Sequence, residues 1–212
     1  MKYLDFVANP ELTRTYCRKL ASPLVSMLNN EPEIGYVVLK NINLIIQKRP
    51  TIMEKELKVF FVNFNDPIYL KLEKIDIMIR LANNDNIHQI LHELKEYTNE
   101  VDVEFARKSI RAIGSCAIKL EKAAEKCTTV LWECLKTTIA HVVQETIIVI
   151  RDVFRKYPKK FDALLVDIFE NVKALEDPDA RSAIIWIIGE YVDIIENANS
   201  LLANFIKKFL LK

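Results

Sequence analysis

Residues 36–50 read YVVLKNINLIIQKRP, and this stretch decides the fold. Its apolar residues Val38, Leu39, Ile42, Ile45 and Ile46 recur at i, i+1, i+4, i+7 and i+8. That spacing places them on one face of an α-helix, so the pattern predicts a helix with a buried side. The two basic residues and the proline that close the stretch are typical of a helix end.

The same spacing returns four more times along the chain, at 68–79, at 103–117, and in segments that begin near residues 143 and 180. The second and third stripes consist of Ile68, Leu72, Ile75 and Ile79, and of Val103, Ala106, Ile110, Ile113 and Ala117. Aligned on one core position, the five stripes place Ile42, Ile75, Ile110, Ile148 and Ile185 in register, with differences of 33, 35, 38 and 37 residues. Such a period without strand signals is typical of stacked helical hairpins.

Partner helices are expected between these five, because apolar residues at helical spacing also fill the intervals. The apolar residues of one interval are Ile87, Ile90, Leu91 and Leu94, and those of another are Ala123, Cys127, Val130 and Cys134. The sequence therefore predicts an all-α fold, an α-solenoid of HEAT- or armadillo-like hairpin repeats. We expect residues 1–212 to form a single solenoid of about five to six repeats. Because residues 201–211 are still apolar, we expect it to belong to a longer trunk.

Prolines and glycines punctuate the helices. Pro32, Pro67 and Pro178 each follow an acidic residue and predict helix starts, whereas Pro23 is expected to divide or kink the helical pattern between residues 11 and 28. The chain has only three glycines. Gly114 and Gly189 fall inside helical patterns, which indicates that another helix approaches closely at each.

Composition excludes several classes of protein. Thirty basic residues balance 29 acidic ones, so the overall charge gives no reason to expect a nucleic-acid partner. The four cysteines lack metal-type spacing, which favours a reducing, cytosolic compartment. Neither a secretory signal peptide nor a membrane-spanning segment is expected.

No catalytic constellation is recognisable. His88 and His92 have the i, i+4 spacing of a metal pair, but the intervening residues lack the glutamate of a zinc-peptidase motif, and both lie away from the apolar stripe. A solvated helix face is the prediction for them. Cys127 and Cys134 lie on an apolar stripe and are expected in the core. Glycine-flanked nucleophiles and phosphate cradles are lacking, so we expect neither an enzyme nor a cofactor or metal.

Two charged patches are candidate binding sites. The basic patch contains Arg151, Arg155, Lys156, Lys159 and Lys160, which either cap a helix end or contact anionic lipid headgroups. Residues 161–206 then carry nine acids against Lys173 and Arg181, a net charge of −7, which suits docking to a basic partner. The acidic docking surface is predicted at Glu190, Asp193 and Glu196. The aromatic residues Phe60, Phe61, Phe64 and Trp186 are expected in the core.

Several blocks resemble a known family. They are NINLIIQKRP at 41–50, KVFF at 58–61, NDPIY at 65–69, LEKIDIMIRLA at 72–82, ELKEY at 93–97, EVDV at 100–103, VIRDVFRKYP at 149–158, EDPDAR at 176–181 and IWIIGEY at 185–191. Together they cover nearly the whole chain, which is thereby identified as similar to the trunk of the β-adaptins. The family's clathrin-binding linker and appendage lie beyond this sequence.

The resemblance implies a non-enzymatic scaffold subunit of a heterotetrameric clathrin adaptor complex, acting in vesicle-mediated protein transport. The implied partners are a second large adaptin, a medium chain and a small chain. The implied location is cytoplasmic and peripheral, on clathrin-coated vesicles at the Golgi or plasma membrane. Two alternatives stay open: another HEAT-repeat scaffold, such as a transport receptor or phosphatase scaffold, and a peripheral module that binds anionic lipid. Which adaptor complex is involved is not specified by these residues.

Overall fold

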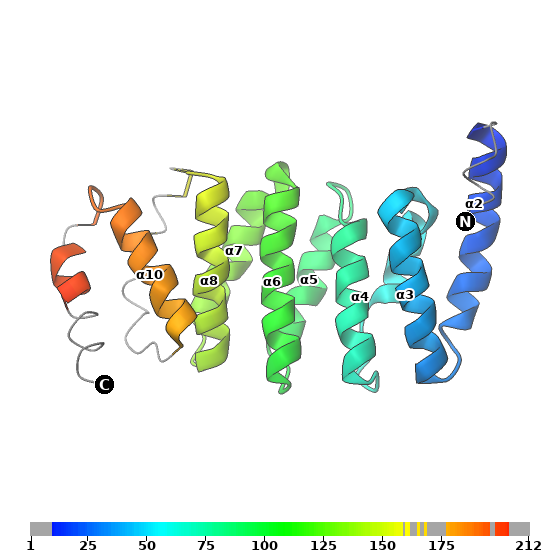
Figure 1. The fold of residues 1–212 in the computed structure, drawn as a ribbon, viewed down its shortest axis with the longest axis horizontal. Helices are drawn as coiled ribbons and strands as arrows, with labels where there is room; N and C mark the ends of the chain where they lie inside the picture. Colours follow the sequence, from blue (N-terminus) through cyan, green and yellow to red (C-terminus); the bar gives the residue numbers. More distant parts are fainter. Residues whose placement is uncertain are drawn as a thin grey trace. The chain divides into compact units, whose positions relative to one another are not determined.

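The computed structural model describes residues 10–158, 160–161, 165, 168, 177–195 and 198–203. Within these residues the regular structure is helical throughout, with no strand (Figure 1). This agrees with the predicted all-α solenoid of helical repeats. The chain divides into two compact units, Met1–Glu93 and Leu94–Lys212, and the division falls within helix α5 (Ile87–Tyr97).

The first unit contains α2 (Pro10–Met27), α3 (Pro32–Lys48) and α4 (Ile68–Leu81). Helix α3 packs against both α2 and α4 (Figure 1). Between α3 and α4 the chain forms two 3₁₀ helices, η1 (Pro50–Ile52) and η2 (Glu54–Phe60), instead of one continuous α-helix. Their backbone leaves the helical region at Glu56, with φ −100° and ψ 19°. This partner element is therefore tighter and more irregular than the apolar spacing predicts.

The second unit contains α6 (Val103–Lys119), η3 (Glu121–Ala123), α7 (Ala124–Leu135), α8 (Ala140–Lys156) and α10 (Pro178–Glu190). Helices α6, α8 and α10 lie side by side, and α7 lies behind α6 and α8 (Figure 1). Helix α8 packs against α6, α7 and α10. Residues 198–203 are also helical. The unit is thus built of two helical layers, with the core between them.

The predicted stripes form much of the core, with two corrections of register. On α4 only Ile75 of the predicted stripe is buried, because Ile68, Leu72 and Ile79 are half-buried and the other buried apolar residues are Leu70, Ile77, Met78 and Leu81. Ile42, Ile75 and Ile110 are fully buried, but Ile148 is half-buried and Ile185 is 44% exposed. The fully buried positions are instead Ile147 and Ile184, one residue earlier in each helix. One residue turns a helix by about 100°, so the neighbouring isoleucine occupies the core. The last two intervals become 37 and 37 residues (147−110 and 184−147).

Three further core predictions were wrong in part. Val103 is 45% exposed because it is the first residue of α6, before the first turn packs. Phe60 is buried as predicted, whereas Phe61 and Trp186 are half-buried. Phe64 is 85% exposed, because the helical pattern stops at Phe60 and Phe64 lies in the turn before α4.

The prolines mark helix starts as predicted at Pro32 and Pro178, which are the first residues of α3 and α10. Pro67 is the residue just before α4. Pro23 does not divide the helix, because α2 runs through it as one helix, and the alternative that it kinks the helix stays a prediction. A proline removes a single backbone hydrogen bond, and the remaining bonds of this helix span the position.

The two helical glycines have opposite surroundings. A Cβ built on Gly114 would overlap Cγ1 of Val149, so this glycine allows α6 and α8 to approach closely, as predicted. A Cβ on Gly189 would meet no atom within 4 Å, and Gly189 is exposed. Among the described residues no other helix approaches Gly189, so that prediction was wrong.

Alanine at these two glycines should change stability in opposite directions. Gly114→Ala should lower the free energy of unfolding by about 1–3 kcal/mol, because Val149 is stiff and must move away. Gly189→Ala should raise it by roughly 0.5–1 kcal/mol, because alanine favours the helix and meets no obstacle. Urea unfolding followed by circular dichroism measures both. If both variants changed the free energy of unfolding by the same amount and in the same direction, the two glycines would not differ in packing.

Candidate binding surfaces

A buried carboxylate organises the second unit. Glu145 lies on α8 with only 2% of its side chain exposed. Arg111 on α6 binds it with two hydrogen bonds, from Nε to Oε1 at 2.5 Å and from Nη2 to Oε2 at 3.1 Å. This two-pronged geometry is the strongest that an arginine and a carboxylate form. The hydrogen bond to Glu145 raises the pKa of Arg111, so the arginine keeps its charge.

The same network reaches the start of α10. Arg107 on α6 places its Nε 3.9 Å from Oε2 of Glu145 and its Nη2 3.6 Å from Oδ2 of Asp177. Asp177 is the N-cap of α10, and its Oδ1 accepts hydrogen bonds from the backbone N–H groups of Asp179 and Ala180. The two arginines of α6 therefore connect α8 to the cap of α10.

The first unit also contains ion pairs that involve buried charged residues. Nζ of Lys40 on α3 lies 2.5 Å from Oε1 of Glu73, a buried residue of α4. Nζ of Lys74, also buried, lies 2.5 Å from Oδ2 of Asp66. The Lys40–Glu73 pair spans 33 residues and the Arg111–Glu145 pair spans 34, close to one repeat. Ion pairs thus link successive helices of the same layer in both units.

Sequence reasoning missed these pairs, although a signal for them exists. Glu73 and Glu145 each lie two residues before a fully buried core isoleucine, Ile75 and Ile147. A carboxylate so close to the core position needs a partner, and a basic residue stands about one repeat earlier in both cases. A basic residue about one repeat before a carboxylate near the core was therefore the sequence signal for these ion pairs.

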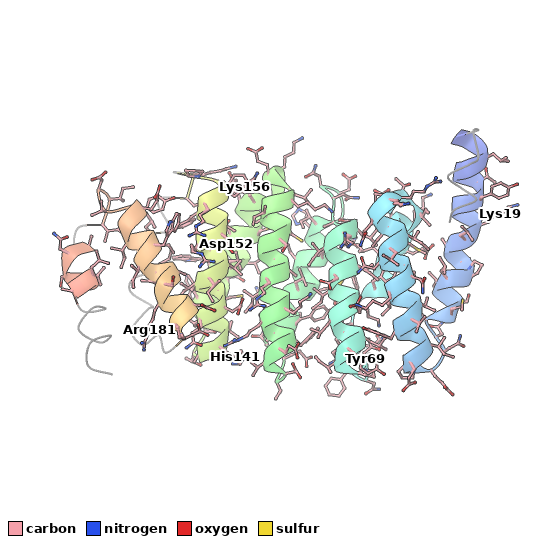
Figure 2. The ribbon with its side chains drawn as sticks, in the orientation of Figure 1. Lys19, Tyr69, His141, Asp152, Lys156 and Arg181 are labelled. Carbon is pink, nitrogen blue, oxygen red and sulfur yellow. The ribbon has the colours of Figure 1, made fainter. Side chains whose placement is uncertain are left out.

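The basic patch lies at the end of α8 and in the turn that follows. Lys156 projects from this end of the helix, and Asp152 lies one turn earlier (Figure 2). Arg151 is half-buried and binds Asp152 through Nε at 3.0 Å and Nη2 at 2.9 Å. Arg155 and Lys156 are exposed. The patch is thus partly neutralised at Arg151 and open to solvent at its other end.

Aromatic rings hold two of the basic groups. The guanidinium carbon of Arg155 lies 4.6 Å from the ring centre of Trp186, which joins α8 to α10. Nζ of the exposed Lys160 lies 5.3 Å from the ring centre of Tyr157. Lys159 lies outside the described residues. The structure therefore places Arg151, Arg155, Lys156 and Lys160 near one helix end, and whether they bind lipid stays a prediction.

The acidic surface begins where α10 ends. Glu190 is the last residue of α10, and Asp193 lies in the turn after it; both are exposed. Glu196 lies outside the described residues. Val192 and Ile194, which sequence reasoning did not single out, are each 46% exposed. The acidic docking prediction thus falls on a surface that is also apolar.

The histidine and cysteine predictions are confirmed. His88 and His92 are exposed, as expected for a solvated helix face. Cys127 and Cys134 are buried, and so is Cys116. Burial raises the pKa of Cys116 and of Cys127 to about 12, so both thiols stay protonated and are poor nucleophiles at neutral pH. They act as small core residues.

The described residues contain neither a metal-binding cluster nor a membrane-spanning helix. Within them, no three or more histidine, cysteine or acidic side chains are grouped so as to hold a metal ion. Among the same residues, none of the helices combines the length and apolar character needed to cross a bilayer.

An exposed apolar face on α3 was also missed. Ile34, Val37 and Leu44 are 43%, 58% and 62% exposed. Their spacing places them on one side of the helix, opposite the buried stripe of Leu39, Ile42 and Ile46. The predicted stripe contains the buried residues of this helix, but the pattern alone does not show that the apolar residues on the opposite side stay exposed.

Layered helical hairpins, linked by ion pairs at the repeat interval, define a helical-repeat protein. The chain belongs to the adaptin family, because residues 5–212 match the family described as the adaptin N-terminal region. It is 53% identical over 210 residues to the AP-1 complex subunit beta-1 of Homo sapiens and 51% identical over 209 residues to the AP-1 complex subunit beta of Dictyostelium discoideum. Each alignment covers 99% of this chain and 22% of the relative.

An AP-2 relative matches as well. The AP-2 complex subunit beta of Schizosaccharomyces pombe is 40% identical over 206 residues, which is 97% of this chain and 30% of that protein. The resemblance to β-adaptins is therefore confirmed, and the chain spans less than a third of the length of these relatives.

Removing the charge of Glu145 should destabilise the second unit. Glu145→Gln should lower the free energy of unfolding by about 2 kcal/mol, because Arg111 and Arg107 lose a buried partner. The matched control is Glu133→Gln, whose partner Lys95 lies 2.5 Å away in a pair with both side chains about half exposed. That control should leave the urea midpoint unchanged. If the two variants unfolded at the same urea concentration, Glu145 would not organise the unit.

Proposed function

We propose that this chain is a scaffold segment of a clathrin adaptor β subunit that binds the other adaptor subunits and carries out no catalysis. The observation that carries the proposal is the identity of 51–53% to AP-1 β subunits along 99% of the chain. Because the chain spans 22% of those relatives, the assembled complex and its role in vesicle transport are part of the proposal. The proposed setting is the cytoplasmic face of coated Golgi or plasma membranes.

The proposed partners are a second large adaptin, a medium chain and a small chain. Helical layers linked by ion pairs to buried carboxylates support this role, because a rigid stack can present side chains from several repeats to one partner. The acidic surface of Glu190, Asp193 and Glu196 is proposed to contact a basic region of the medium chain's amino-terminal domain. Clathrin binding is assigned to parts of a β subunit other than these residues.

Co-purification with the amino-terminal domain of an adaptor medium chain tests the proposal. The unchanged chain should retain this domain on an affinity column. The triple charge reversal Glu190→Lys, Asp193→Lys and Glu196→Lys should reduce retention about tenfold or more, because like charges then face each other. The matched control reverses three exposed acids elsewhere, Glu104→Lys, Glu121→Lys and Glu125→Lys.

The control should retain the domain fully, and circular dichroism should show both variants helical. If the helical, unchanged chain retained no medium-chain domain, the proposed partner would be wrong. If both triple variants lost it equally, the acidic surface would not be the contact.

Anionic lipid is a second proposed ligand, favoured by the exposure of Arg155, Lys156 and Lys160. Sedimentation with phosphatidylserine vesicles should deplete the chain at low salt and less so at high salt. Charge reversal of Lys156, Lys159 and Lys160 should abolish that depletion. If the variant sedimented as the unchanged chain does, the lipid proposal would be wrong.

A further inference from the structure

The side of α10 that faces away from the core contains Gly189. No neighbour among the described residues explains why this position is a glycine. Gly189 lies in the last turn of this α-helix, where glycine weakens a helix. At Gly114 the close approach of Val149 explains the missing side chain, but at Gly189 a Cβ would meet nothing within 4 Å. Since none of the described residues covers Gly189, a molecule from outside can reach its backbone.

Two apolar side chains and a serine share one helix face with this glycine. Ser182, Ile185 and Trp186 precede Gly189 by seven, four and three residues, so all four lie on one face of α10. Ile185 is 44% exposed, and Trp186 is half-buried under the guanidinium of Arg155. The opposite face carries Ala180, Ala183, Ile184, Ile187 and Ile188, all fully buried. The exposed face is thus distinct from the core stripe and still apolar.

Two more exposed apolar side chains follow directly after α10, and acids lie near both ends of the helix. Val192 and Ile194, each 46% exposed, follow in the turn after α10. Asp179 is exposed in the first turn, and Glu190 and Asp193 are exposed at the other end. A ligand that covers Ile185 and Gly189 would therefore meet negative charge before and after its apolar contacts.

We propose that Ser182, Ile185, Trp186, Gly189, Val192 and Ile194 form a docking surface for a basic amphipathic helix of a protein partner. An apolar stripe on the partner would cover Ile185 and Trp186, and its basic residues would face Asp179, Glu190 and Asp193. Gly189 allows the two helix backbones to approach closely. This inference rests on the proposed scaffold role and specifies its surface and the chemistry of its partner.

Fluorescence anisotropy with a designed peptide tests the surface. The probe is a fluorescein-labelled peptide of about 18 residues, five helical turns, with leucine on one face and lysine and arginine on the other. Its control is a peptide of the same composition, scrambled so that no face is apolar. The unchanged chain should bind the first peptide and not the second.

Substitutions at one position separate docking from folding. Gly189→Leu should weaken peptide binding by about tenfold or more, because its side chain occupies the contact. Gly189→Ala should also weaken binding, but less than Gly189→Leu, because a single methyl group only partly blocks the close approach, while the chain unfolds at higher urea. Thr129→Leu adds the same side chain at an exposed position of α7 and should bind as the unchanged chain does. Circular dichroism establishes that all three are folded.

Several outcomes would overturn the inference. They are equal binding by a folded Gly189→Leu chain, equal binding of the scrambled peptide, or no binding of either peptide. Sedimentation velocity of the chain alone tests a second copy as the occupant, and self-association lost in Gly189→Leu would assign the surface to that copy. Loss of phosphatidylserine-vesicle binding in the same variant would assign it to a membrane.

The failure of this inference can be told from the failure of the proposed function. If Gly189→Leu retained the medium-chain domain fully and bound the peptide normally, the scaffold role would stand and the α10 surface would not. If the medium-chain domain bound no variant while peptide binding depended on Gly189, the surface would stand and the adaptor partner would not.

Discussion

The second unit depends on the burial of one negative charge. Glu145 lies among the apolar side chains of α8 with 2% of its own side chain exposed, and a carboxylate there is tolerated only when it is paired. Both arginines that pair with it come from α6, and one of them also reaches Asp177, the cap of α10. The charge requirement therefore sets the register of three helices at once, which apolar contact alone does not do, because isoleucine packs in several orientations.

This register determines which residues of α10 face the core and which face away from it. With Asp177 held at the cap, Ile184, Ile187 and Ile188 turn toward the core, and Gly189 turns away from it. The stacking of Arg155 on Trp186 fixes the same orientation from the other side of the helix. The exposed face of α10 is consequently a product of the buried network, and a partner there would meet a surface that is already ordered. Preorganisation of this kind lowers the entropic cost of binding.

Much of the fold could be predicted because helical periodicity depends only on which residues are apolar. The repeat length, the helix starts at Pro32 and Pro178, and the close approach at Gly114 all followed from residue type and spacing. Prediction failed where two equivalent residues stood side by side, as at Ile184 and Ile185, because either one satisfies the pattern. It also failed at Phe64, where a turn interrupts the pattern, and for the exposed faces of α3 and α10, because exposure depends on which neighbours the helix meets. The acidic and basic patches could be located from charge, but not the pairing that neutralises Arg151.

In a helical-repeat protein each repeat ordinarily contacts only its immediate neighbours, so stability is close to a sum over adjacent pairs. Arg107 departs from this rule, because it joins α6 to Asp177, 70 residues later, which is nearly two intervals of 37. Helix α8 lies between them and supplies Glu145 to the same arginine. A force that displaces the start of α10 must either separate Asp177 from Arg107 or move α6 along with it. Since separation leaves charge unpaired near the interior, α6, α8 and the cap of α10 respond together, which is the mechanical property that a scaffold needs.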